Sequence, residues 1–418
     1  MNERSRLLIT GIQDTLPDME QVYMSIHSNP ELSMQEYSTA GLISKMLNEY
    51  GFEVITGIGK TGVVGILRNG DGPIVMARAD MDALPVREDT GLPYASRAMG
   101  TDGDGKAVPV MHACGHDIHV AWLLGTALLY SKYKNEWHGT LITVFQPAEE
   151  IAAGSKAMID DGLFKKIPRP DVVLGQHVMV GSSGVIGWRA GVITSTADSL
   201  EIKMFGRGAH GSMPQSSIDP VIMAASTVLR LQTIVSREVS PSDFAVLTIG
   251  ALQVGNKDNV IPDEAMLKLN IRTLDENIRK HTLSAVERIV NAEASASNAT
   301  KKPEIRELEH YSLVKNDPDA TAKVVASFKN NFQAGQLHEA QPTSASEDFG
   351  NFGTEIGAPS VFWFVGGTDP VKFAEAEKNG TVGEIPTNHN PHFAPVIHPT
   401  LESGIKAMVS AAGAWLFS

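Results

Sequence analysis

Residues 1–191 alternate between short apolar runs and longer segments in which apolar residues recur at helical spacing. The short runs are rich in Val and Ile, and they predict strands at 52–56, 62–69, 73–80, 139–146 and 171–178. The helical spacing predicts helices at 31–51, 118–133 and 154–164. Short apolar strands separated by helices are typical of a largely parallel sheet that is covered on both faces.

The pattern changes after about Gly191, where the next strand alternates polar and apolar residues. The elements predicted there are a strand (198–206), a helix (219–238), two strands (243–254 and 264–274), a helix (275–296) and a strand (303–311). This β-α-β-β-α-β order is that of a ferredoxin-like unit. Beyond it, the alternation of helices and short apolar strands resumes, with a helix predicted at 319–332, a strand at 359–367 and a helix at 401–417. We therefore expect an α/β fold in which a domain of residues 192–311 is inserted into a larger domain of residues 1–191 and 312–418.

The composition is that of a globular protein, and its net charge limits the kinds of partner that the protein is expected to bind. The 418 residues are 42% hydrophobic and 20% charged, and 35 basic against 48 acidic residues give a formal net charge of −13. This negative charge argues against nucleic acid as the main partner. The sequence shows no apolar signal-peptide core, no run as long as a membrane span, and a single cysteine that excludes an intrachain disulfide. We therefore expect a cytoplasmic protein that binds neither nucleic acid nor a membrane.

Residues with metal-ligand chemistry gather at four places along the chain. They are Cys114 and His116 in MHACGHDIH, Glu149 and Glu150 in FQPAEE, His177 in VVLGQHV, and His389 and His392 in TNHNPHF. A thiolate and an imidazole one residue apart can bind one metal ion or a neighbouring pair of ions. The glutamate pair and His177 fall at the ends of predicted strands, where open parallel sheets form their sites. This shared position indicates a metal site at the carboxyl edge of the sheet.

Two other roles for Cys114 are compatible with the sequence. A cysteine nucleophile needs a histidine base and an orienting group nearby, a geometry that the sequence does not exclude. That role leaves the glutamate pair, His177 and His389 without a purpose, whereas a metal site uses all of them. A structural zinc site prefers four closed ligands rich in cysteine, which a single cysteine fits poorly.

The chain also resembles a known family. The motifs RADMDALP, MHACGHDIH, FQPAEE, GQH, GRGAHGSMP, IDP, NVIP, SEDF and HNPHF occur in the order seen in M20 metallopeptidase-like amidohydrolases. The chain looks most like the branch that holds hippurate hydrolases, N-acyl-amino-acid amidohydrolases and plant auxin-conjugate hydrolases. The resemblance extends from about His27 to the C-terminal helix, and HACGHD together with QPAEE is a specific combination. It implies a catalytic domain with two metal ions and an inserted lid domain through which a homodimer or higher homo-oligomer forms.

The resemblance implies a role for each matching residue. The implied metal ligands are Cys114, His116, Glu150, His177 and His389. Glu149 would be the general base, and Asp80 would be the aspartate that orients a ligand. On the lid, His210 would reach the active site, in several relatives from the partner subunit. Asn259 and Arg272 would hold the carboxylate of the substrate.

The reaction that the resemblance implies is hydrolysis of the amide bond of N-acyl or N-aroyl amino acids. A metal-bridged water activated by Glu149 would attack, and the products would be a carboxylic acid and an amino acid. The mixed sulfur, nitrogen and oxygen ligands admit zinc, manganese, cobalt or nickel. The alternatives are a dipeptidase or a biosynthetic N-acyl-intermediate deacylase of the same superfamily, and a non-catalytic binding protein that retains the fold.

The chain departs from the family pattern at four positions. Ile151 follows the glutamate pair where glycine is usual, and Gln215 stands where a histidine is common. His392 stands where arginine or tyrosine is usual, which makes it an alternative ligand to His389. Arg78 stands where other branches have a metal-binding histidine, so the CGH segment is expected to supply ligands instead. These departures leave the substrate preference open.

Overall fold

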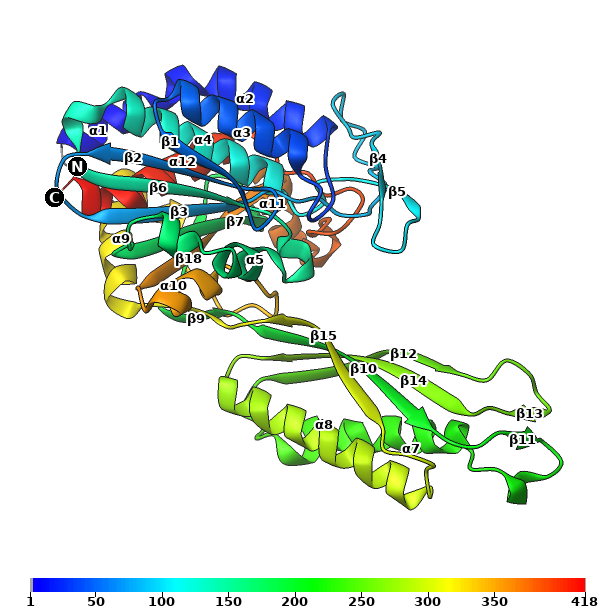
Figure 1. Ribbon diagram of the computed structural model, residues 1–418. Helices are drawn as coiled ribbons and strands as arrows, with labels where there is room; N and C mark the ends of the chain where they lie inside the picture. Colours follow the sequence, from blue (N-terminus) through cyan, green and yellow to red (C-terminus); the bar gives the residue numbers. More distant parts are fainter. Residues whose placement is uncertain (1–2, 418) are drawn as a thin grey trace. The chain divides into compact units, whose positions relative to one another are not determined.

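The computed structural model describes residues 3–417, in which the chain forms two compact units (Figure 1). The larger unit extends to Ile193 and includes Lys315–Gln341 and the chain from Asp348 onward, and the smaller unit is formed by Thr194–Val314 and Pro342–Glu347. The segment 342–347, which the sequence assigned to the larger domain, therefore groups with the smaller unit. The reason is hydrogen bonding, because Arg272 Nη1 donates to Ser344 O at 2.7 Å and Ser195 Oγ donates to the same oxygen at 2.9 Å.

The larger unit is built on an eight-stranded sheet whose middle is parallel. The strand order is β1-β2-β6-β3-β7-β18-β8-β17. Strand β3 runs parallel to β6 and β7, and β18 runs parallel to β7, whereas the pairs β1–β2, β2–β6 and β18–β8 are antiparallel. The strands are β1 (Glu53–Ile58), β2 (Gly62–Asn69), β3 (Ile74–Asp80), β6 (Gly139–Gln146), β7 (Val172–Ser182), β8 (Ile186–Trp188), β17 (Leu337–Glu339) and β18 (Ser360–Thr368). The predicted α/β class with a largely parallel sheet is confirmed.

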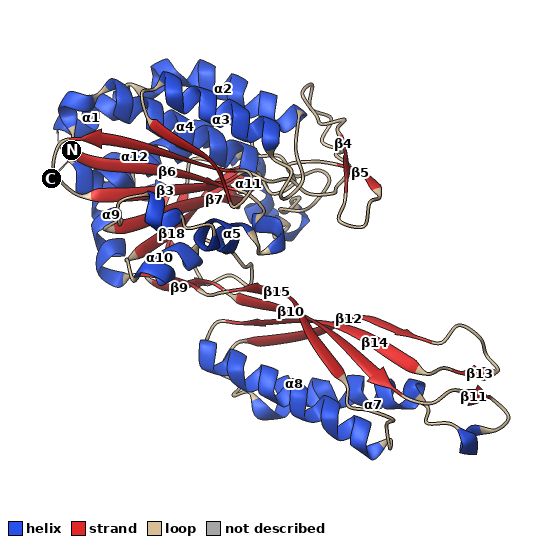
Figure 2. Cartoon of the chain, in the orientation of Figure 1, coloured by secondary structure: helices blue, strands red, loops and turns tan. Residues whose placement is uncertain are grey.

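Helices cover both faces of this sheet (Figure 2). Helices α4 and α12 pack against β3 and β7, and α5 packs against β6. Helix α4 is buried along nearly its whole length, which explains why its sequence is apolar all round. The helices are α1 (Glu3–Thr10), α2 (Ile12–Ser28), α3 (Tyr37–Glu49), α4 (His116–Lys132), α5 (Gly154–Asp160), α6 (Leu163–Lys166), α9 (Pro318–Asn331), α10 (Gly350–Ile356), α11 (Pro370–Asn379) and α12 (Ile397–Leu416). Within residues 3–417, no helix is both long and apolar enough to span a membrane.

Three predicted helices differ from the observed ones, of which the helix predicted at 219–238 ends as α7 at Thr233 and is followed by a π-helical turn at Ile234–Glu238. The helix predicted at 31–51 begins only at Tyr37, because the preceding residues form a turn in which Leu32 pairs with Ala83 and Met34 is left-handed at φ 63°. The helix predicted at 154–164 is broken into α5 and α6, because Gly162 is left-handed at φ 82°. The spacing of apolar residues alone does not indicate the late start of α3 or the break between α5 and α6.

The smaller unit is an antiparallel sheet packed against two helices. The strand order is β12-β14-β10-β15, and the chain order β10-α7-β12-β14-α8-β15 is the predicted β-α-β-β-α-β. Helix α7 begins as the sequence suggests, with the Asp219 side chain accepting from Val221 N at 2.8 Å ahead of Pro220. The elements are β10 (Thr196–Phe205), β11 (Ala209–His210), α7 (Pro220–Thr233), β12 (Ala245–Val254), β13 (Val260–Ile261), β14 (Glu264–Thr273), α8 (Glu276–Ala296) and β15 (Glu304–Tyr311).

Candidate active site

The candidate site lies at the carboxyl ends of three adjacent parallel strands of the larger unit. Strand β3 ends at Asp80, β6 ends at Gln146 shortly before the glutamate pair, and β7 carries His177. The register places Asp80 beside Gln146 and Arg78 beside Gly175, so the ends of β3 and β6 lie level with His177, although β7 itself continues to Ser182. Open parallel sheets form their sites at this edge.

The loop ahead of α4 delivers Cys114 and His116 to this edge. Gly115 between them is left-handed at φ 81°, and a Cβ at this position would lie 2.4 Å from Val178 Cγ1. Glycine is therefore required both by the backbone conformation and by the close approach to β7. His116 is the first residue of α4, and its side chain is fully buried.

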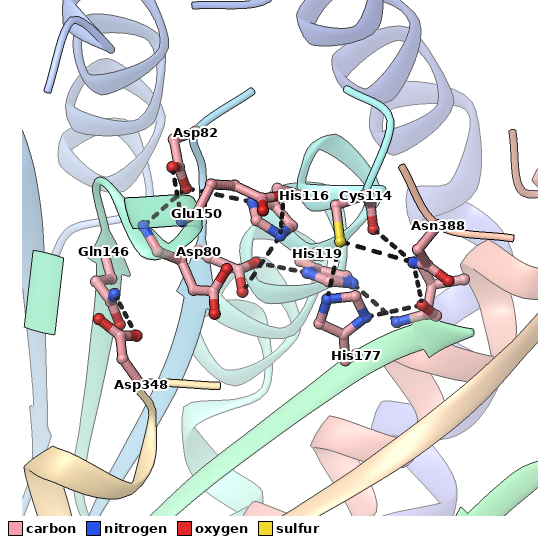
Figure 3. Close-up of polar contacts among 12 residues, drawn as sticks. Asp80, Asp82, Cys114, His116, His119, Gln146, Glu150, His177, Asp348 and Asn388 are labelled. Atoms are coloured by element: carbon pink, nitrogen blue, oxygen red, sulfur yellow. Dashed lines mark hydrogen bonds and ion pairs between the residues drawn. The ribbon is translucent and has the colours of Figure 1, made fainter. Parts of the chain in front are cut away.

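Six of the predicted site residues form one cluster, and Figure 3 shows four of them, Cys114, His116, Glu150 and His177. Cys114 Sγ lies 3.5 Å from His177 Nε2, and His389 Nε2 lies 3.3 Å from Glu150 Oε2. Ligand atoms of Cys114, Glu150 and His389 lie within 4.8 Å of one another, which connects the two pairs, and His116 Nε2 lies 3.7 Å from Glu150 Oε1. The sixth member is Glu149, which offers an oxygen within 4.8 Å of ligand atoms of His116 and Glu150.

The chemistry of this cluster fits divalent metal ions. Nε2 of His116 and Oε1 of Glu150 are buried and carry no hydrogen bond among residues 3–417, whereas Nδ1 of His116 lies 3.3 Å from Asp82 Oδ1. Burial raises the pKa of the Glu150 carboxyl, and burial together with Glu150 raises the pKa of the Cys114 thiol well above its usual value. A nearby cation would reverse both shifts and would bind Nε2 of His116 and Oε1 of Glu150. This buried group of thiol, imidazole and carboxylate ligands is therefore suited to bind metal ions.

Asp80 and His119 form a hydrogen-bonded support behind the cluster. His119 Nδ1 donates to Asp80 Oδ1 at 2.5 Å, and His119 Nε2 accepts from Val178 N at 2.9 Å. Burial lowers the pKa of His119 to about 3, which agrees with a neutral ring that donates at one nitrogen and accepts at the other. Asp80 Oδ2 lies 3.8 Å from His116 Nε2. His119 has no predicted role, although its spacing from His116 on one helix places both rings on the same face.

Arg78 is the fixed positive charge of this region. Its Nη1 donates to Asp80 Oδ2 at 2.7 Å and its Nη2 to Asp348 Oδ1 at 3.1 Å, and all three side chains are completely buried. Burial would raise the pKa of Asp80, but the charge of Arg78 and those of the neighbouring histidines lower it well below its usual value. Where other branches of the family have a histidine, this chain therefore has a buried ion pair.

His392 lies beside a loop rather than beside Glu150. Its Nδ1 donates to Asp89 O at 2.5 Å, and its Nε2 lies 3.8 Å from Asp89 Oδ2. His389 is the histidine of this segment that contacts Glu150. The geometry thus favours His389 over the alternative of His392.

The three other predicted residues lie in the smaller unit. His210 on β11 pairs with Val260, and Gly211 N donates to Asn259 O at 2.8 Å, so His210 and Asn259 lie close together. Arg272 on β14 donates to Ser344 O through Nη1 and to Asn270 Oδ1 through Nε at 3.0 Å. The part of these residues in the site stays a prediction.

Comparisons with known proteins place the chain in a family. The model of peptidase family M20/M25/M40 matches residues 76–412. The chain is 40% identical to a hippurate hydrolase of Campylobacter jejuni over 82% of this chain and 87% of the relative. It is 36% identical to thermostable carboxypeptidase 2 of Saccharolobus solfataricus (92% and 93%) and 35% identical to an N-acetyl-L-cysteine deacetylase of Bacillus subtilis (82% and 78%).

Among solved structures, the chain is similar to one described as a dinuclear metal binding peptidase from the M20 family, from Bacillus subtilis. The TM-score is 0.76 at 27% identity, and the match covers 96% of this chain and 98% of the other. The family model, the relatives and the solved structure each match most of the chain. The protein therefore belongs to peptidase family M20/M25/M40 and is a metal-dependent amidohydrolase.

Proposed function

We propose that this protein hydrolyses the amide bond of N-acyl or N-aroyl amino acids and releases a carboxylic acid and an amino acid. The observation that carries the proposal is the position of Glu149, a buried carboxylate within 4.8 Å of ligand atoms of His116 and Glu150. An acid–base group held beside a metal-ligand cluster is what hydrolysis by an activated water requires. The two relatives that act on N-acyl amino acids, by their names, support this substrate class.

In this proposal two divalent metal ions are held by Cys114, His116, Glu150, His177 and His389. Bound there, the ions would polarise the amide carbonyl and lower the pKa of water. Glu149 accepts a proton from the attacking water and passes it to the nitrogen of the leaving amine, because one carboxyl group can serve as base and then as acid. Asp80 would hold the His119 ring through its hydrogen bond, and Asp82 Oδ1, which lies 3.3 Å from His116 Nδ1, would orient the His116 ring from the side away from Glu150.

The smaller unit would act as a lid that contacts the substrate. His210 Nδ1 accepts from Ser212 N at 3.1 Å, so Nε2 is the ring nitrogen that can donate to a developing oxyanion. Asn259 and Arg272 would bind the substrate carboxylate. Because Nε and Nη1 of Arg272 already donate within the unit, we expect the carboxylate to share this guanidinium rather than to replace its partners.

The test is metal-dependent turnover on a panel of acyl amino acids. Purified protein should hydrolyse N-benzoylglycine or N-acetyl amino acids, lose this activity after chelation, and regain it with zinc, manganese, cobalt or nickel. Metal analysis should find two ions per chain. Activity that survives complete removal of metal would contradict the mechanism, and metal-replete protein that hydrolyses none of the panel would favour a binding protein.

A carboxypeptidase or dipeptidase activity is the second candidate, and the similarity to thermostable carboxypeptidase 2 favours it. Both activities cleave an amide next to a free α-carboxylate, and they differ in what precedes that amide. A matched pair of substrates with the same C-terminal residue, one N-benzoylated and one a dipeptide with a free amine, separates them. Preference for the dipeptide would contradict the first candidate.

We further propose that the protein forms a homodimer or higher homo-oligomer through the smaller unit. Within residues 3–417, strands β12 and β15 are the edges of its sheet, so no further strand of this sheet pairs with their outer sides. Light scattering of the purified protein tests this assembly, and a monomer at all concentrations would contradict it.

A further inference from the structure

Glu149 and Glu150 sit in a short, tightly closed segment, residues 147–154, which we call the glutamate turn. Ala148 and Ala152 flank the pair, and both are left-handed, at φ 48° and φ 53°. Residues other than glycine adopt this conformation at an energetic cost, and it persists where the surroundings hold it in place. Three buried carboxylates, those of Glu36, Asp82 and Asp348, hold the glutamate turn by hydrogen bonds.

The first holding group is Glu36, which is fully buried. Its Oε1 accepts from Ala148 N at 2.9 Å and from Met34 N at 2.8 Å. Its Oε2 accepts from the hydroxyl of Thr61 at 2.6 Å. Glu36 thus binds the backbone immediately before the glutamate pair.

The second holding group is Asp82, two residues beyond the end of β3. Its Oδ1 accepts from Glu149 N and its Oδ2 from Glu150 N, each at 3.1 Å (Figure 3 shows the contact with Glu150). The hydroxyl of Ser33 donates to Oδ2 at 2.6 Å and fixes the carboxylate from the other side. Asp82 therefore binds the backbone of the glutamate pair itself.

The third holding group is Asp348, which binds the two residues that flank the glutamate turn, Gln146 and Ser155. Its Oδ2 accepts from Ser155 N at 3.0 Å, and its Oδ1 accepts from Gln146 Nε2 at 2.7 Å. Arg78 Nη2 also donates to Oδ1, which balances the charge. Asp348 thereby ties the end of β6 to the start of α5.

The three carboxylates share one property besides any contact with the metal cluster, which Asp82 Oδ1 approaches at 3.3 Å from His116 Nδ1. Each uses both of its oxygens, and together they accept from four backbone N–H groups of residues 148–155. Buried N–H groups need an acceptor, and the first N–H groups of a helical turn have none within the turn. A carboxylate offers two oxygens to such groups, whereas an amide offers one.

We propose that Glu36, Asp82 and Asp348 are positioning residues, which fix the backbone of the glutamate turn so that Glu149 and Glu150 face the cluster from defined places. This inference rests on the proposed function, in which Glu149 is the general base. None of the three needs to contact the substrate. Their effect is on the placement of Glu149, and a displacement of about 1 Å can lower a rate by about 100-fold.

The main test compares Glu36→Ala with Glu36→Gln. Alanine leaves Ala148 N and Met34 N without their acceptor. We expect kcat to fall by about 10- to 100-fold while KM stays within about three-fold, since the placement of the base changes and substrate binding does not. Glutamine keeps one oxygen for both N–H groups and turns its amide nitrogen toward the Thr61 hydroxyl, which can accept, so it should restore most of kcat.

The matched control is Glu31→Ala. Glu31 accepts from Ser38 N and Thr39 N, each at 2.9 Å, which is the same kind of bond at the start of α3. We expect this variant to be less stable to urea while its kcat stays within about two-fold of the wild type. If Glu36→Ala lowers kcat no more than Glu31→Ala does, the positioning role is contradicted.

A second measurement does not depend on the substrate. In metal-loaded protein, amide hydrogen exchange of peptides covering residues 146–155 should become faster in Glu36→Ala and stay unchanged in Glu31→Ala. Unchanged exchange in Glu36→Ala would overturn the inference, even if activity falls. Conversely, a wild type that hydrolyses no acyl amino acid overturns the proposed function, and the exchange result still decides whether Glu36 holds the turn.

Asp348→Asn provides an independent variant if Glu36→Ala does not fold. Asparagine has one oxygen, so it must release either Ser155 N or the pair formed by Gln146 and Arg78. We expect the same fall in kcat and the same faster exchange of residues 146–155. Failure of both variants to fold, with a folded Glu31→Ala, would show that these carboxylates stabilise the whole unit, and it would overturn the specific role in the turn.

Discussion

Replacing His27 with glutamine should remove a part of the stability that depends on pH. His27, on α2, is 1% exposed, and its two ring nitrogens contact two carboxylates. Nδ1 donates to Asp117 Oδ2 at 2.6 Å, and Nε2 donates to Glu88 Oε1 at 3.0 Å. Because both contacts require an N–H, the ring is held as an imidazolium between α4 and the loop that follows β3.

The magnitude follows from the pKa of His27. Burial alone would lower this pKa, but the hydrogen bonds and charges of Asp117 and Glu88 outweigh burial and raise it from 6.5 to about 9. This rise corresponds to about 3 kcal/mol in favour of the protonated ring in the folded state. Since the folded-state value is the higher one, the contribution is complete below about pH 6.5, declines as the pH rises, and is lost above about pH 9.

The assay is urea unfolding of metal-loaded wild type and His27→Gln at about pH 6 and about pH 10, followed by tryptophan fluorescence. The difference in the free energy of unfolding between the two proteins should shrink by about 3 kcal/mol between these pH values. His138→Gln is the matched control, because His138 Nδ1 contacts the carbonyl of Leu416 rather than a carboxylate. A difference that stays constant with pH, or grows, would refute the reasoning.

Three further changes have defined outcomes. Glu149→Gln should keep the metal content and lower kcat by about 100- to 1,000-fold, as measured by metal analysis and steady-state kinetics, and near-normal activity would remove Glu149 as the base. Cys114→Ser should lower the metal content of the purified protein, whereas full metal with no activity would revive a cysteine nucleophile. Gly115→Ala should lower the free energy of unfolding by more than about 2 kcal/mol, because it adds left-handed strain to a clash with Val178, and a thermal unfolding midpoint within about 1 °C of the wild type would contradict this.

Much of the fold could be predicted because many strands and helices carry a local pattern, whereas several elements, namely α1, α2, α10, α11, β8 and β17, were not predicted. Strand β2 begins and ends where the apolar run does, and Asp219 with Pro220 marks the start of α7. The places where prediction failed lack such a pattern. Nothing near Ser344 indicates that its segment hydrogen-bonds to Arg272, a residue 72 positions away in the sequence.

The candidate site could be predicted in part, because strand ends and unusual residues point to it. Cys114, His116 and the glutamate pair stand out in sequence, and the structure brings them together. The carboxylates that hold the turn do not stand out. Glu36 lies 112 positions from Ala148, whose N–H it binds, and an acidic residue in a polar segment usually faces solvent. Long-range hydrogen bonds from backbone groups leave no periodic signal that a single sequence could show.

The division of the chain between the two units has a consequence for attempts to separate them. The chain passes from one unit to the other after residues 193, 314, 341 and 347, so the smaller unit is not one continuous insertion. A fragment of residues 194–314 would leave the guanidinium of Arg272 and the hydroxyl of Ser195 without their acceptor at Ser344. To transplant or express the smaller unit alone, residues 342–347 would therefore have to be joined to it through a new connection.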